Sequence, residues 1–280
     1  MISPFFEFEF LQNAFFSGLL IGLIAPLLGV YIVVRRLSLI ADALSHVTLA
    51  GIAVSLFLEK KWGILAGANP IYMGMAFSVT GSLLIERLRG LYKHYQELAI
   101  PIILSGGIGI GAIFISLADG FNKDLMNYLF GSVLAVTRSD LMIVVGISIF
   151  VLLIIGLLYK ELFVLSFDEE HATASGIQAK WIHFIFILTV ALVIAASMRI
   201  VGILLVSSLM TLPVAASIRI AKGFKQAMFL SVIFGELSVI IGLIVAYQAD
   251  LAPGGTIVVL NIIILVLSII VSKFKRGHVQ

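Results

Sequence analysis

The chain has 280 residues, of which 61% are hydrophobic and 12% are charged, and its mean hydropathy is +1.18. Because a soluble domain is about half apolar and about a quarter charged, this composition excludes a soluble globular protein and predicts a polytopic membrane protein. The formal net charge of +3 does not indicate a nucleic-acid binder, since the basic residues lie in short clusters at the ends of apolar runs.

Nine apolar runs follow one another along the chain, each close to the ~20 residues that a helix needs to cross about 30 Å of hydrocarbon. They predict an all-α fold with about nine transmembrane helices. The break at Ala68-Asn69-Pro70 and the division near Met198-Arg199 leave a count of eight to ten open. No linker or regular repeat separates the runs, so we expect one membrane domain over residues 1–280. The runs cover residues 11–34, 37–58, 63–85, 98–118, 140–158, 182–198, 200–218, 227–247 and 256–272.

The basic residues predict the orientation of the chain in the membrane. With the N-terminus outside, 13 of the 18 Lys and Arg residues fall on the cytoplasmic side, as the positive-inside rule describes. We therefore expect a multi-pass protein of the cytoplasmic (inner) membrane, embedded in the lipid bilayer, with its C-terminus in the cytoplasm. The 13 residues are Arg35, Arg36, Arg87, Arg89, Lys93, Lys160, Lys180, Arg219, Lys222, Lys225, Lys273, Lys275 and Arg276.

The second run contains Asp42 and His46, four residues apart in an otherwise apolar stretch. An ionisable side chain at membrane depth costs about 2.5 to 3.5 kcal/mol, so such a pair usually has a function. On a helix both side chains leave the same face, where a carboxylate oxygen and an imidazole nitrogen can bind one divalent cation. With no cysteine in the chain, such a site has to use oxygen and nitrogen ligands. A structural alternative stays open, in which Asp42 pairs with an arginine or caps a helix and His46 bonds a neighbouring carbonyl.

The segment Tyr128–Val136 is apolar but too short to span the membrane. It lies between polar stretches on the predicted outer side. Two interpretations are equally open, a re-entrant half-helix near the outer surface and an anchor in the membrane interface.

The loop from Tyr159 to Trp181 contains the sequence SFDEEHATASG, which predicts a short helix on the cytoplasmic face. An aspartate suits the N-cap, two glutamates complement the positive end of the helix dipole, two alanines favour helix, and a glycine suits its end. From these residues alone, a simple surface helix and a docking element are both open. The residues are Asp168, Glu169, Glu170, Ala172, Ala174 and Gly176.

Glu236 is a single carboxyl in the eighth apolar run, beside Gly235 and close to Ser238. It is a candidate metal ligand along the same polar route as the Asp42–His46 pair. The alternative is a protonated carboxyl that is bonded to a neighbouring helix.

Five stretches of the chain together resemble the permease subunits of bacterial ABC importers for zinc and manganese. The match follows the family's order over nearly the whole chain. The resemblance implies a fold related to the large permeases of ABC importers, a permease homodimer, a separate cytoplasmic ABC ATPase and an extracytoplasmic metal-binding protein. The stretches are VVRRLSLIADALSHVTLAGIA (33–53), YLFGSVLAV (128–136), SFDEEHATASG (166–176), VGILLVSSLMTLPVAASIR (201–219) and APGGTIVVL (252–260).

The same resemblance implies roles for individual residues. Asp42 and His46 fall on the family's metal-path positions, and residues 168–176 fall on its cytoplasmic coupling helix. The metal is then cargo, and no permanently bound cofactor is expected. Ala41 stands where many members have glycine, and residues 49–51 lack the proline often seen in manganese-type members. We therefore expect Zn²⁺ as the cargo, with Mn²⁺ or Fe²⁺ as the alternative.

Two other functional classes can be weighed against a permease. An intramembrane metal-dependent hydrolase would need a third ligand and a base near Asp42 and His46, which the sequence does not display. A membrane receptor without transport would not need the two residues on one helix face. The chain also contains no Walker A and no HExxH sequence, so we expect it to be no enzyme, with ATP hydrolysed by a partner.

Overall fold

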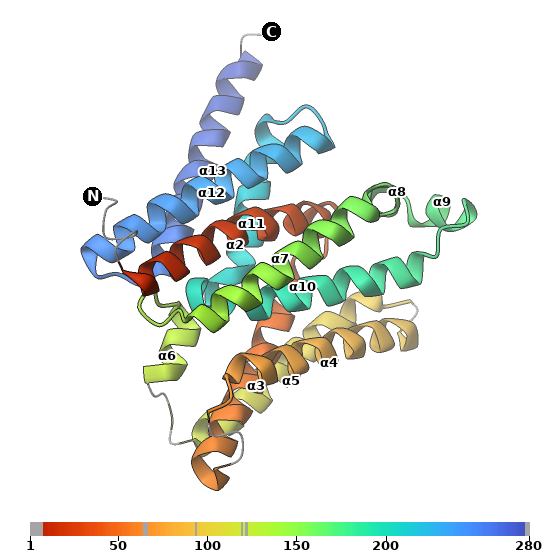
Figure 1. The fold of residues 1–280 in the computed structure, drawn as a ribbon. Coiled ribbons are helices and arrows are strands. Elements are labelled where there is room, and N and C mark those ends of the chain that lie inside the picture. The colour runs from red at the N-terminus through yellow and green to blue at the C-terminus, as the bar shows by residue number, and fades with distance from the viewer. Residues whose placement is uncertain (1–7, 64–66, 93, 119, 121–122, 278–280) are drawn as a thin grey trace.

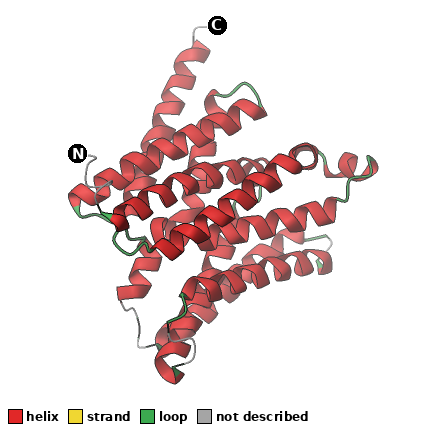
Figure 2. Cartoon of the chain, viewed as in Figure 1, coloured by secondary structure: helices red, strands yellow, loops and turns green. Residues whose placement is uncertain are grey.

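The computed structural model describes residues 8–63, 67–92, 94–118, 120 and 123–277, and the regular structure in these ranges is helical (Figure 1, Figure 2). The all-α prediction is therefore confirmed. Within the described ranges, each predicted apolar run corresponds to one long helix. These helices are α2 (Glu9–Val34), α3 (Leu39–Trp62), α4 (Pro70–Leu91), α5 (Ala99–Leu117), α7 (Arg138–Leu157), α10 (Ala179–Val201), α11 (Ile203–Ile220), α12 (Phe224–Ala249) and α13 (Pro253–Gly277).

Four short helical segments connect the long ones: η1 (Gln96–Leu98), α6 (Lys123–Phe130), α8 (Tyr159–Phe167) and α9 (Glu169–Ala174). Among the described residues, seven helices are long and apolar enough to cross a membrane. Helix α4 is not one of these seven, and the apolar part of α11, Leu205–Ile220, is shorter. The protein is thus a multi-pass membrane protein, and nine is an approximate number of spans.

The third predicted run begins too early. Residues 63–85 were expected to form it, whereas α4 begins at Pro70 and continues to Leu91. Asn69 is the N-cap, and its side chain accepts a hydrogen bond of 3.1 Å from the backbone N–H of Ile71. A proline in the first turn needs no hydrogen-bond donor, so Asn69-Pro70 starts a helix instead of interrupting one.

Helices α10 and α11 are joined by the single residue Gly202, three residues after the predicted division at Met198-Arg199. Its φ of 87° and ψ of 150° lie in a region that is almost restricted to glycine. A Cβ atom at this position would stand 2.5 Å from the carbonyl oxygen of Leu129, which leaves no room for a side chain. The corner between the two helices therefore depends on this glycine.

Only the first three residues of Tyr128–Val136 are helical, so the segment is not the half-helix that is one of its two open interpretations. The helix lies earlier, as α6, and residues 131–137 are not helical. Gly131 has a φ of 77°, and the backbone N–H of Ser132 donates a 3.0 Å hydrogen bond to the carbonyl of Arg199. Helix α6 ends here because its chain turns to meet the end of α10.

Helix α2 lies at the centre of the molecule and packs against α7, α10, α11 and α12. In Figure 1, α2, α7 and α10 run across the middle, while α13 extends toward the top and α3 toward the bottom. Helix α3 packs most closely with α4 and α5. A Cβ at Gly235 would lie 2.5 Å from Cγ of Pro26, so α12 approaches α2 closely. In a lipid environment, van der Waals contacts of this kind hold helices together.

Candidate functional site

Asp42 and His46 lie on α3, in the first turn and at the eighth of its 24 residues. Both are partly exposed, whereas the residues between them, Ala43 to Ser45, are buried. The four-residue spacing therefore places the two side chains on one open face of an otherwise packed helix. A carboxylate in the first turn is also favoured by the helix dipole.

The other polar side chains of this part of α3 are bonded within the helix. The hydroxyl of Ser45 donates to the carbonyl of Ala41 at 2.7 Å, and that of Thr48 donates to Leu44 at 2.6 Å. In the described part of the chain, Asp42 forms no ion pair with an arginine, and His46 forms no hydrogen bond with a carbonyl. The carboxylate oxygens of Asp42 and the imidazole nitrogens of His46 are therefore available to bind a metal ion.

The described residues contain no group of three or more His, Asp or Glu side chains that could hold a metal ion. Asp42 and His46 are therefore a two-ligand site within one copy of the chain. A divalent transition metal takes four or more ligands, so water or another chain has to supply the rest.

Glu236 is not brought together with Asp42 and His46. It lies on α12, which packs against α2, α11 and α13, and a Cβ added to Gly22 of α2 would stand 3.3 Å from its carboxyl group. Its Oε2 atom is buried and has no hydrogen-bond partner among the described residues. Its role as a metal ligand stays a prediction, and it would act apart from the pair on α3.

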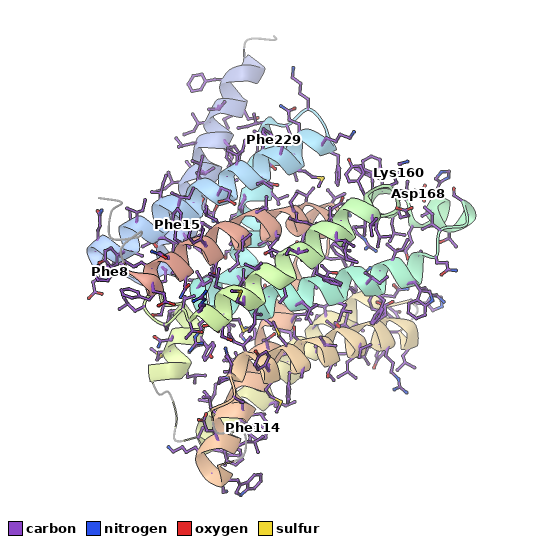
Figure 3. The ribbon with its side chains drawn as sticks, in the orientation of Figure 1. Phe8, Phe15, Phe114, Lys160, Asp168 and Phe229 are labelled. Carbon is purple, nitrogen blue, oxygen red and sulfur yellow. The ribbon has the colours of Figure 1, made fainter. Side chains whose placement is uncertain are left out.

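The predicted short helix of the loop at 159–181 is present as α9. The Asp168 side chain caps it by accepting a 2.8 Å hydrogen bond from the backbone N–H of His171. Gly176, with a φ of 85°, ends it, and the N–H of Ile177 reaches back to the carbonyl of Ala172 at 3.1 Å. Ala172 is buried, whereas Glu169 and Glu170 are exposed. Figure 3 shows Asp168 at one end of the molecule, near Lys160 of α8.

A polar cluster that the sequence did not predict lies where α4 and α7 begin and α10 ends. The Asp140 carboxylate accepts a hydrogen bond of 2.7 Å from Asn69 and forms an ion pair of 2.7 Å with Arg199. It also forms a capping box with Thr137 at the start of α7. A pocket of about 740 Å³ adjoins this cluster, and Glu59 is the carboxylate in its lining.

A second unpredicted cluster lies at the opposite ends of α4 and α10. His183 is hydrogen-bonded to Arg89, and its Nε2 lies 3.4 Å from a carboxylate oxygen of Glu86. Glu86 and Arg89 also form an ion pair of 3.6 Å within α4. For both clusters the sequence holds only a partial signal, such as the capping-box spacing of Thr137 and Asp140, because their partners are distant along the chain.

Comparisons with known proteins agree over nearly the full length of the chain. The model of the ABC 3 transport family matches residues 7–272. A Treponema pallidum protein named "Probable metal transport system membrane protein" is 34% identical over 97% of this chain and 99% of its own length. The manganese import system permease protein ScaB of Streptococcus gordonii is 32% identical over 96% of this chain and 94% of its own.

A solved structure supports the same relationship at the level of the fold. It is PsaBC from Streptococcus pneumoniae in complex with Fab, and a chain of it matches with a TM-score of 0.81 and 31% identity. The match covers 96% of this chain and 95% of that one. The arrangement of helices described above is therefore shared with a protein of known structure.

Proposed function

The chain belongs to the ABC 3 transport family and is a permease subunit of a metal ABC importer, and we propose that it carries Mn²⁺ through the site formed by Asp42 and His46. It is a transport subunit and not itself an enzyme. One observation carries the proposed site: a carboxylate and an imidazole share the open face of α3 and have no bonding partner among the described residues. Such a pair can hold a divalent ion and also release it.

The choice of metal rests on the relatives and on ligand chemistry. The sequence led us to expect zinc, and the comparisons do not confirm it. The relative from Streptococcus gordonii is named for manganese, and the carboxylate of Asp42 suits that ion. Zn²⁺ is the second candidate, because the imidazole of His46 suits it and because residues 49–51 lack proline.

Two copies of the permease would complete the ligand set. One copy offers two ligands on an open face of α3, and a homodimer with these faces opposed would offer two carboxylates and two imidazoles. Four such ligands suffice for a first-row divalent metal. The homodimer is therefore part of the proposal.

The partners and the orientation follow from the importer architecture. We place the N-terminus outside and the C-terminus in the cytoplasm, as the distribution of Lys and Arg favours. Helix α9 then faces the cytoplasm, where its exposed acidic turn would contact the ATPase. An extracytoplasmic binding protein would deliver the metal at the opposite side, where the pocket beside Asp140 lies.

Metal uptake by cells that carry single variants tests the site. Asp42→Asn and His46→Ala should each abolish Mn²⁺ uptake while the amount of permease in the membrane stays near normal. Ser45→Ala is the matched control, because its hydroxyl lies on the same helix turn and is bonded to Ala41 instead of being free for a ligand. Normal uptake in both site variants would refute the proposed site. Parallel uptake of Zn²⁺ and Fe²⁺ decides the metal.

A further inference from the structure

A polar pocket of about 240 Å³ lies where α2 ends, beside α4 and the junction of α8 and α9. Three arginines line it, Arg35, Arg36 and Arg89. Glu169 is the single acidic residue in the same lining. The pocket therefore has an excess of positive charge, and a small anionic group would complement it.

Arg35 has a hydrogen-bond donor that no described residue satisfies. Its Nη1 atom is buried and has no partner among these residues, and its guanidinium carbon lies 5.9 Å from the centre of the Phe186 ring. Burial lowers the pKa of Arg35 to about 10, while Glu169 opposes this change, so the group stays charged at neutral pH. A buried, charged donor without an acceptor is unfavourable, and an anion would relieve it.

Arg36 occupies a backbone position that glycine normally fills. Its φ is 57°, and it stands directly after the end of α2, where its N–H donates to Val33 at 3.1 Å and the N–H of Leu37 donates to Ile32 at 2.8 Å. This is the helix-ending motif in which glycine is preferred. An arginine in the left-handed region is retained at a conformational cost, which points to a use for its side chain.

Arg89 is held in place from two sides. It is hydrogen-bonded to His183 on α10, and its Nη2 donates to Gln96 of η1 at 3.2 Å. Two neighbours therefore hold this guanidinium group at the pocket, whereas Arg35 and Arg36 come from the end of α2.

An apolar groove of about 310 Å³ continues from the pocket, and the two share Val34 and Phe167. Val30 and Phe224 also line the groove. Val30 lies one helical turn before Val34, so the groove leads from the end of α2 back along the helix toward the apolar interior. Phe167 is 62% exposed, which leaves the groove open to a further apolar group.

We propose that this pocket and groove bind an anionic phospholipid, with its phosphate among the three arginines and an acyl chain along Val34 and Phe224. Guanidinium groups bind phosphate oxygens through paired hydrogen bonds, and basic pockets between membrane helices bind anionic headgroups. The apolar groove distinguishes this ligand from a free anion, which would leave it unfilled.

Native mass spectrometry of the delipidated permease with its ATPase tests the proposal. Titrated phosphatidylglycerol should remain bound, and phosphatidylcholine with the same acyl chains should not. Arg35→Gln and Arg36→Gly should each lower phosphatidylglycerol retention by about fivefold, the effect of one basic residue near a membrane surface. The control is Lys160→Gln, which removes a charge from an exposed residue of α8 outside both pockets and should leave retention unchanged (Figure 3).

A folding control and a variant that fills the groove complete the test. Thermal unfolding of Arg36→Gly should occur at or above the wild-type temperature, because glycine suits a φ of 57°, so lost lipid binding cannot be assigned to misfolding. Ala221→Trp places a large side chain in the groove, and this single substitution should weaken the binding of phosphatidylglycerol. Equal retention of both lipids would overturn the proposal. So would inorganic phosphate that displaces the lipid fully while Ala221→Trp has no effect, since the site would then bind only a free anion.

Discussion

Asp140 and Arg199 are joined by an ion pair of 2.7 Å that connects the first turn of α7 to the last turn of α10. The side chain of Asp140 is only 3% exposed, and Asn69 donates a hydrogen bond to the same carboxylate. Because Asn69 caps α4, one carboxylate holds three helix ends together. A charge buried in this way is stable only while its partner is present.

Asp140→Asn should therefore destabilise the permease strongly. The substitution leaves Arg199 without its counter-charge in a mostly buried place, at a cost of about 3 kcal/mol. Thermal unfolding in detergent or lipid discs and the amount of protein in the membrane measure the effect. The double variant with Arg199→Gln removes both charges and should recover part of the loss. If the loss of stability in the double variant equals the sum of the losses in the two single variants, the two residues are not coupled.

His46→Asp should raise the ratio of Mn²⁺ uptake to Zn²⁺ uptake above that of the wild type. The substitution replaces the imidazole by a second carboxylate on the same face of α3, and carboxylates serve Mn²⁺ better than they serve Zn²⁺. Uptake of both ions should be compared for the wild type and the variant with the same binding protein and ATPase present. An unchanged ratio of the two uptake rates would show that His46 does not set the preference.

Substitutions in α9 should separate ATP hydrolysis from transport. Glu170→Lys reverses a charge on the exposed first turn, and Gly176→Pro removes the glycine whose φ of 85° ends the helix. We expect either ATPase activity without metal transport or loss of the ATPase on purification. The control is Glu97→Lys, the same reversal on an exposed residue of η1, which should transport normally. If ATP hydrolysis and metal transport stay fully coupled in both α9 variants, this helix does not link the two activities.

Much of the helical fold can be predicted from the sequence, because each element depends on its own residues. The apolar run at 227–247 lies within α12, and Asp168 and Gly176 mark the ends of α9 through caps that are local in the chain. Asp42 and His46 could be assigned to one helix face for the same reason, since a spacing of four residues fixes their relative direction.

What could not be predicted depends on residues that are distant in the sequence. Helix α6 ends at Phe130 because the following residues meet the carbonyl groups at the end of α10, and nothing in Tyr128–Val136 reveals that contact. The bonds of Asp140 with Asn69 and Arg199 have the same origin. In the sequence, Glu236 lies in an apolar run, as Asp42 and His46 do. The sequence does not show that the Glu236 side chain faces α2, because that depends on how α12 packs.

The corner at Gly202 has a mechanical meaning. Because only one residue connects α10 to α11, a tilt or shift of α10 also displaces the start of α11. Helix α10 contacts α9 at its beginning, and α11 packs against α3, which bears Asp42 and His46. If α9 moves, this connection would carry the displacement through α10 and α11 to the neighbourhood of the pair, and a longer, flexible link at residue 202 would absorb it.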